Sequence, residues 1–226
     1  MAAQLRALPT ARYRKEDIHV TTILDEDATR ANILGTLQTL SKRIRPTDDF
    51  ILFIAGHGEL LQGGRYAILM HDYDGRTDEV DNFIGKQEII GAHRIMTALQ
   101  RIPALSQTII LDTCHAGGVM DSLITDLYNA RMSTLARRMG MHIYASASSM
   151  ERALDGHKGN GLFTHTLLEG LRNNLEADRD NDKKVSVVEW GRFAKEKTAA
   201  IAKTLNHKQD PTIINFGRDR VVYELR

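Results

Sequence analysis

Two runs of almost uninterrupted apolar residues constrain the fold of this chain more than any other feature. They are FILFIA at 50–55 and TIIL at 108–111. A strand that is covered on one face alternates apolar and polar residues, whereas continuous apolar runs of this length are typical of strands buried on both faces. Such strands occur in parallel sheets that carry helices on each side. The two runs therefore predict an α/β architecture.

Helical and strand patterns alternate along the rest of the chain. Apolar residues at helical spacing predict helices at 2–8, 33–44, 95–102, 123–139, 162–175 and 187–205. Short β-branched or apolar segments predict further strands at 18–24, 66–70, 142–145 and, as an edge strand, 211–216. The alternation predicts a mostly parallel central sheet with helices on both faces. A length of 226 residues suits one such domain.

Charge and cysteine content exclude several classes of protein. The chain has 30 basic and 29 acidic residues, so no excess charge favours nucleic acid or an anionic membrane as its main partner. No apolar run approaches the roughly 20 residues that a membrane span needs. A single cysteine, Cys114, excludes an internal disulfide. We therefore expect a soluble protein of a reducing compartment, which indicates the cytoplasm.

Unusual chemistry follows the two buried strands. The first runs into Gly56-His57-Gly58, and the second runs into a segment that begins with Asp112 and contains Cys114. The C-terminal ends of neighbouring parallel strands meet at one edge of a sheet, where function gathers. A thiol has a pKa of about 8.5, and a nearby imidazole can accept its proton during nucleophilic attack. The alternatives are that Cys114 is a small buried apolar residue and that His57 is an exposed loop histidine.

The segments IAGHG and LDTCHAGG resemble the clan of caspases, metacaspases and paracaspases, most closely its prokaryotic caspase-like branch. The similarity continues through LDEDATRANI, IYASAS, GLFTHTLLEGL and ADRDNDKKVSVVEW. It implies a caspase-like three-layer sandwich over residues 1–226. It also implies a cysteine endopeptidase of protein or peptide substrates, with Cys114 as nucleophile and His57 as base. The N–H groups of Gly58 and Cys114 would form the oxyanion hole, and no metal would take part in the chemistry.

Residues near the thiol predict the substrate preference. Asp112 lies two residues before Cys114, so the two side chains can point to the same side of the strand. Relatives with Asp at this position cut after Arg or Lys, which implies cleavage after a basic residue. By the same resemblance, Ser146, Ser148 and Glu151 would add polar groups to the pocket. The alternatives are that Asp112 caps a neighbouring turn or that cleavage follows an acidic residue.

A second acidic pattern lies nearer the C-terminus. Asp178, Asp180 and Asp182, with Glu189 in twelfth place, resemble the calcium ligands of an EF-hand loop. However, Lys183 occupies the sixth position, where that motif has Gly. Ser186 and Glu189 also form a capping box for the last helix. The sequence therefore leaves open a calcium site or a structural acidic turn.

The segment between Val119 and Met141 corresponds to the intersubunit linker of caspases. It contains Arg131, Arg137 and Arg138, so an enzyme that cuts after basic residues can process itself here. The competing interpretation is an ordinary amphipathic helix.

The start of the chain differs from the pattern of the family, because the central first strand of the caspase-like fold is missing. We therefore expect this sequence to be part of a longer or cleaved polypeptide. A companion segment, or a sensor or repeat domain, would then supply the strand. Two other functions compete with peptidase activity: a catalytically silent assembly module, and a different thiol hydrolase such as an amidase. In the latter class the histidine usually follows the cysteine, whereas His57 precedes Cys114.

Overall fold

A computed structural model describes residues 1–8, 13–61, 65–73, 88–118, 140–148, 150–172 and 174–225. Within these ranges the helices are α1 (Ala2–Arg6), α2 (Arg30–Ser41), α3 (Ala92–Leu99), α6 (Leu162–Gly170) and α7 (Val187–Thr204). The strands are β1 (Asp49–Leu61), β2 (Arg65–Leu69), β3 (Ile89–Gly91), β4 (Ser106–Thr113), β5 (Met141–Ala145), β6 (Lys184–Ser186), β7 (Thr212–Asn215) and β8 (Val221–Glu224). No helix in the described ranges has both the length and the apolar character that crossing a membrane requires.

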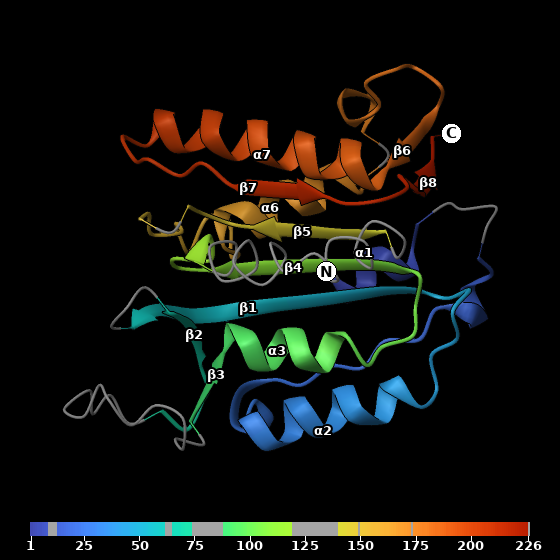
Figure 1. The fold of residues 1–226 in the computed structure, drawn as a ribbon. Helices are drawn as coiled ribbons and strands as arrows, with labels where there is room; N and C mark the ends of the chain where they lie inside the picture. The colour runs from blue at the N-terminus through green and yellow to red at the C-terminus, as the bar shows by residue number, and fades with distance from the viewer. Residues whose placement is uncertain are drawn as a thin grey trace.

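The central sheet has six strands in the order β3-β2-β1-β4-β5-β7. The two apolar runs lie in β1 and β4, which pair in parallel, and β4 pairs in parallel with β5 (Figure 1). Strands β2, β3 and β7 join the flanks in antiparallel orientation. Strand β7 is the edge strand that the sequence predicts. The predicted α/β class and the parallel pairing at the centre of the sheet are therefore confirmed.

Two apolar clusters cover opposite faces of the sheet. Ile109 and Leu111 of β4 pack in one cluster with residues of α2 and α3. Ile110, which lies between them, packs in the other cluster with Trp190 and Phe163 of the α6–α7 layer. Successive side chains of a strand point to opposite faces, so this division follows directly from the run TIIL. The result is the predicted three-layer sandwich.

Several predicted elements differ from the structure. The segment 18–24 is extended but pairs with no described strand, so its prediction as a strand is wrong. A strand needs a neighbouring strand to satisfy its backbone, and the part of the chain that is described offers none beside this segment. Strands β3, β6 and β8, each of three or four residues, are too short to give a sequence pattern. The helix predicted at 123–139 lies outside the described residues.

Helix α6 ends at Gly170, five residues before the predicted end. Its last carbonyl groups are taken by side chains from elsewhere: the indole N–H of Trp190 donates to Leu167 at 2.9 Å and the hydroxyl of Tyr223 donates to Gly170 at 2.6 Å. A Cβ on Gly170 would lie 2.9 Å from the ring of Phe193. The carbonyl of Leu167 also accepts the N–H of Leu171 at 3.2 Å, whereas the final carbonyls of a helix lack partners within the helix, so the hydroxyl of Tyr223 satisfies the carbonyl at the end of α6.

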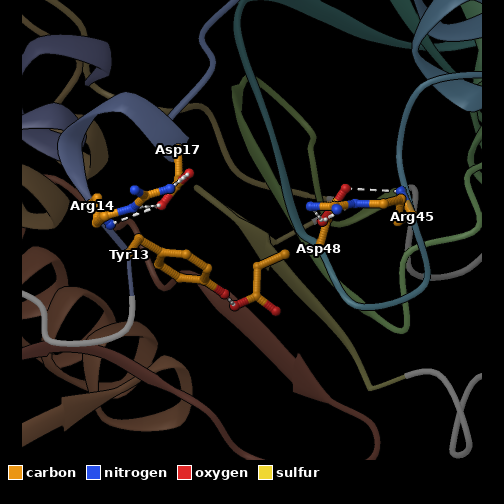
Figure 2. A network of polar contacts seen from close by, with 6 residues as sticks. Tyr13, Arg14, Asp17, Arg45 and Asp48 are labelled. Carbon is orange, nitrogen blue, oxygen red and sulfur yellow. Dashed lines mark hydrogen bonds and ion pairs between the residues drawn. The ribbon is translucent and has the colours of Figure 1, made fainter.

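Polar contacts anchor the start of β1 (Figure 2). The hydroxyl of Tyr13 donates a hydrogen bond to the carboxylate of Asp49, the first residue of the strand. Two nearby turns are closed by ion pairs, Arg14 with Asp17 at 3.0 Å and Arg45 with Asp48 at 3.1 Å. Both arginine side chains are exposed, so these pairs add little to stability. The contact of Tyr13 ties the N-terminal segment to the sheet.

One edge of β1 is open in the described part of the chain. Residues 49–56 pair with β4 along one edge of β1. Pairing with β2 begins only at His57. Ile51 is 36% exposed, although it belongs to the run FILFIA that predicts burial on both faces. The open edge explains the difference, because a strand with one neighbour leaves part of each face uncovered.

Candidate active site

Strands β1 and β4 are neighbours, and their parallel pairing stops at one rim of the sheet, although β1 itself continues to Leu61. In the parallel register of β1 and β4 the last pair joins Gly56 to Thr113. His57 and Cys114 are the next residues on each strand. His57 is exposed and Cys114 is partly exposed. The backbone thus brings both residues to one accessible edge, where the parallel pairing of β1 and β4 stops.

The two backbones also approach closely just after His57 and at Cys114. A Cβ on the buried Gly58 would collide with the carbonyl oxygen of Cys114 and with the ring of Tyr66. Only glycine allows this approach. The hydroxyl of Tyr66 is hydrogen-bonded to the hydroxyl of Thr113, and burial raises the pKa of Tyr66 far above its usual range. The phenol is therefore neutral, and it packs against Gly58 and Thr113 without adding charge.

The turn after Cys114 is held by a second segment, called here the rim loop, of which residues 146–148 and 150–154 are described. His115 has a φ of 55°, a left-handed conformation that non-glycine residues rarely adopt. Its N–H donates to the carbonyl of Glu151 at 3.2 Å, and the N–H of Gly117 donates to Ala147 at 2.9 Å. These two bonds fix the turn that presents Cys114 at the rim.

Asp112 is buried behind the nucleophile and lies against the start of α6. Its Oδ2 accepts hydrogen bonds from the backbone N–H of Thr164, at 3.0 Å, and from the hydroxyl of the same residue. A Cβ on Gly161 would come within 2.5 Å of this oxygen. Burial raises the pKa of Asp112, although hydrogen bonds from Thr164 and Ser146 act in the opposite direction. The carboxylate thus caps a helix from a buried position.

The other predicted pocket residues have structural partners. The hydroxyl of Ser146 donates to the carbonyl of Thr113 at 2.9 Å and accepts from its N–H at 3.1 Å. Ser148 is partly exposed, and its N–H donates to the carboxylate of Glu151 at 3.4 Å. That carboxylate also accepts the N–H of Asp210 at 2.9 Å. Ser146 therefore holds Thr113, and Glu151 holds the turn after Cys114 and the C-terminal segment. Ser148 is partly exposed near the same edge of the sheet.

Comparison with known proteins identifies the family to which this site belongs. Residues 9–218 match the family described as the caspase domain. The chain belongs to the caspase family. The predicted resemblance is thereby confirmed at the level of the family.

Relatives of this caspase domain include fungal metacaspases. The chain is 29% identical to metacaspase-1B of Aspergillus terreus over 151 residues, which cover 61% of this chain and 38% of that protein. It is 27% identical to metacaspase-1A of Neurospora crassa over 208 residues, which cover 84% and 44%. The chain thus spans less than half the length of these relatives.

A solved structure shares the fold of this domain. The crystal structure of protein GSU0716 from Geobacter sulfurreducens superposes with a TM-score of 0.59 at 16% sequence identity. The match covers 93% of this chain and 84% of that one. At this identity the likeness shows the fold alone.

Sequence reasoning missed three residues that support the site of this caspase domain. Tyr66 lies against Gly58 and Thr113, Thr164 binds the carboxylate of Asp112, and Gln209 joins the C-terminal segment to the loop that begins at Ser146. The amide of Gln209 is buried, where it accepts from the N–H of Leu154 at 2.9 Å and donates to the carbonyl of Ser146 at 2.8 Å. No sequence pattern marks these partners, because each acts on a segment distant along the chain.

The remaining predicted sites lie away from the rim or outside the described residues. Asp178, Asp180 and Asp182 come together in the loop before β6. Glu189 lies in the first turn of α7 and takes part in the predicted capping box with Ser186. The three arginines of the predicted self-cleavage segment, Arg131, Arg137 and Arg138, lie outside the described residues.

Proposed function

We propose that this chain is a cysteine endopeptidase in which Cys114 is the nucleophile and His57 is the general base. The observation that carries the proposal is the parallel register of β1 and β4, which sets both residues directly after the same strand pair. The side chain of His57 is exposed and that of Cys114 is partly exposed, so both are open to solvent at the rim. Membership of the caspase family supports the same roles.

The reaction needs only the groups of this rim. The sulfur of Cys114 attacks the carbonyl carbon of the scissile peptide bond while its proton passes to His57. The imidazolium then protonates the leaving amine, and the acyl group remains as a thioester. Water, deprotonated by the same imidazole, attacks the thioester and releases the carboxylic acid and the thiol. The N–H groups of Gly58 and Cys114, whose backbones lie too close together for a Cβ on Gly58, are the proposed donors to the oxyanion.

A substrate-like covalent label tests this function directly. A peptidyl-arginine chloromethylketone should add one label to the protein, and intact-mass and peptide analysis should place that label on Cys114. The variant Cys114→Ala should stay unlabelled, and His57→Ala should label at least about 100-fold more slowly. Lys208→Ala, at an exposed position, is the matched control. Equal labelling of wild type and His57→Ala would overturn the proposed dyad.

We propose that Asp112 directs cleavage to Arg or Lys. Its buried carboxylate lies two residues before the proposed nucleophile, and a guanidinium can bind a carboxylate through two hydrogen bonds. The bonds from Thr164 also favour the alternative role, in which Asp112 is only a helix cap. A carboxylate has two oxygens, so Oδ2 can cap α6 while Oδ1 serves the substrate. The two roles are separated by Asp112→Asn, which removes the charge and keeps an oxygen for the N–H of Thr164.

We further propose that an extended segment from outside residues 1–226 pairs with the open edge of β1 at 49–56. An exposed apolar edge strand invites pairing with another chain. Expressed alone, residues 1–226 should therefore self-associate, and Ile51→Lys should restore a monomer, as measured by light scattering. An active, stable wild-type monomer of residues 1–226 would contradict this proposal.

The chemistry also bears on substrates and location. The proposed substrates are proteins or peptides, since the reaction cleaves an amide between two residues. A catalytic thiol that is partly exposed is subject to oxidation, so we propose that the enzyme works in the reducing cytoplasm. Loss of activity under mild peroxide, with recovery on adding dithiothreitol, would fit this location, whereas resistance to peroxide would not.

A further inference from the structure

Three carboxylates gather in the loop that leads from the helical turn at Leu175–Ala177 into β6. One oxygen from each of Asp178, Asp180 and Asp182 lies within 4.8 Å of the others. Each residue is also tied to the loop: the carboxylates accept the N–H groups of Lys183 at 3.0 Å, Asp182 at 3.1 Å and Lys184 at 2.8 Å, respectively. The loop thus holds three like charges together although they repel one another.

One of these carboxylate oxygens lacks a partner. Asp178 is 8% exposed, and its Oδ1 is buried with no hydrogen-bond donor among the residues that the structure describes. Its other oxygen, Oδ2, accepts the N–H of Lys183. A buried oxygen of an ionised carboxylate is costly to leave unsatisfied, and a bound cation removes that cost. This oxygen is the observation that distinguishes the loop from an ordinary acidic turn.

The backbone of the loop also removes the objection that the sequence raises. Lys183 stands where EF-hand loops have Gly, yet it has a φ of 67°, in the left-handed region that glycine usually supplies. Asn181 has a φ of 61°. The loop therefore makes the sharp turn without glycine.

Glu189, the twelfth residue of the series, has a different task from its EF-hand counterpart. Its Oε1 accepts the N–H of Arg179 at 2.8 Å, and its Oε2 accepts the N–H of Ser186 at 2.9 Å. Burial tends to raise the pKa of Glu189, but these backbone donors outweigh it and lower the pKa. With both oxygens occupied, Glu189 caps α7 and shapes the loop rather than binding a cation.

We propose that Asp178, Asp180 and Asp182 form a binding site for a divalent cation, and that calcium is the preferred ion. Calcium takes six to eight oxygen ligands in flexible geometry, and water and backbone carbonyls can complete a shell that three carboxylates begin. Magnesium demands stricter octahedral geometry and dehydrates reluctantly. Without a bidentate glutamate, the dissociation constant for calcium should fall at about 0.1–1 mM.

Calcium binding is measured on the inactive variant Cys114→Ala, so that the result is independent of peptidase activity. Titration calorimetry counts the calcium ions bound by this protein and by the same protein with Asp180→Asn and Asp182→Asn. Both aspartates are exposed, and Asn keeps an oxygen that accepts the loop N–H groups, so the fold is retained. Fluorescence of Trp190, the single tryptophan, checks that retention. The expected result is the loss of one site, or at least about tenfold weaker binding.

The control changes an acidic segment of similar composition. Asp25→Asn with Asp27→Asn alters two exposed carboxylates at the other end of the chain, and it should leave calcium binding unchanged. Calcium at 100 times its dissociation constant should raise the unfolding midpoint by about 5–10 °C in the control, and the Asp180→Asn, Asp182→Asn protein should lose that increase. Equal stoichiometry and affinity in these two proteins would overturn the site. An equal preference for magnesium would overturn the choice of calcium.

Discussion

The two strands that carry the proposed dyad lie side by side but differ in their surroundings. Every residue of β4 is buried, since β1 and β5 pair with its two edges and helical layers cover its faces. Strand β1 has exposed residues at several positions, Ile51 and His57 among them, and over 49–56 only β4 pairs with it among the described strands. The proposed nucleophile thus directly follows a strand that is buried throughout, and the proposed base lies on a strand that is partly exposed.

This difference teaches that similar sequence runs acquire different roles from their neighbours. Turn residues after Cys114 are fixed by the carbonyls of Glu151 and Ala147, which belong to a loop that the C-terminal segment holds in turn. From His57 onward, β1 pairs with β2. Substitutions on β4 should therefore reduce stability first, and substitutions at the rim should reduce activity alone.

The largest expected effect is on catalysis. Cys114→Ala should reduce hydrolysis of an arginyl peptide by at least about 10⁴-fold, and His57→Ala by at least about 10³-fold. Neither should change the free energy of unfolding by more than about 1 kcal/mol, because both side chains lie at the surface of the rim. Steady-state kinetics and urea unfolding measure the two quantities. A large loss of stability in His57→Ala would show that the base is also a structural element and would break the comparison.

The next largest effect should fall on the buried strand. Ile110→Ala removes a fully buried side chain between the sheet and the α6–α7 layer, so the free energy of unfolding should drop by about 2–5 kcal/mol. Ile51→Ala, on the open part of β1, should cost less than about 1 kcal/mol in the same urea experiment. Equal losses would mean that β1 is as well covered as β4.

Much of this arrangement follows from residues that can be recognised in the sequence. The runs FILFIA and TIIL give the two central strands, and the segments that follow them carry His57 and Cys114. The parallel register then brings the two residues to one edge, although β1 continues to Leu61, beyond the end of its apolar run. These features are local, so a pattern of a few residues is enough to predict them.

The parts that were missed depend on partners distant along the chain. Segment 18–24 has the composition of a strand, but no described strand lies beside it. Ile51 is exposed because no described strand pairs with that part of β1 on the edge opposite β4. The capping of α6 by Asp112 requires two segments 52 residues apart, and the hold of Gln209 on Ser146 spans 63 residues. The unsatisfied oxygen of Asp178 is likewise a consequence of burial, which the spacing of the aspartates cannot give.

Asp112 is the next position at which the comparison can be sharpened, because it lies on β4 but is proposed to act at the rim. Asp112→Asn keeps an oxygen for the N–H of Thr164 and removes the charge. Cleavage after Arg should fall at least about 30-fold, as expected when one partner of a buried charge pair is lost. Stability at pH 7 should stay within about 1 kcal/mol of wild type, whereas Asp112→Ala should lose about 1–3 kcal/mol. Unchanged turnover in the Asn variant would leave Asp112 as a helix cap alone.

The pH dependence of stability provides a separate check on Asp112. Burial raises its pKa in the folded protein above the ordinary value of 3.8, so the folded state binds the proton more tightly than the unfolded chain. This carboxyl therefore makes unfolding easier as the pH rises from 3.8 through the folded-state pKa, and its penalty is complete above that pKa. Asp112→Asn should remove this slope in urea unfolding measured against pH. A slope that persists in the variant belongs to other groups.

The smallest effects should distinguish two adjacent residues that hold the rim loop. Gln209 is buried and both ends of its amide are hydrogen-bonded, so Gln209→Ala should cost about 1–3 kcal/mol and lower turnover by loosening the loop that fixes the turn after Cys114. Lys208 pairs with Glu151 at 3.2 Å, but its side chain is 87% exposed. Lys208→Ala should therefore change stability by no more than about 1 kcal/mol and leave turnover intact. If Lys208→Ala lowered turnover as much as Gln209→Ala, the loop would depend on the surface charge of Lys208 rather than on buried hydrogen bonds. The nucleophile would then not be better supported than the base.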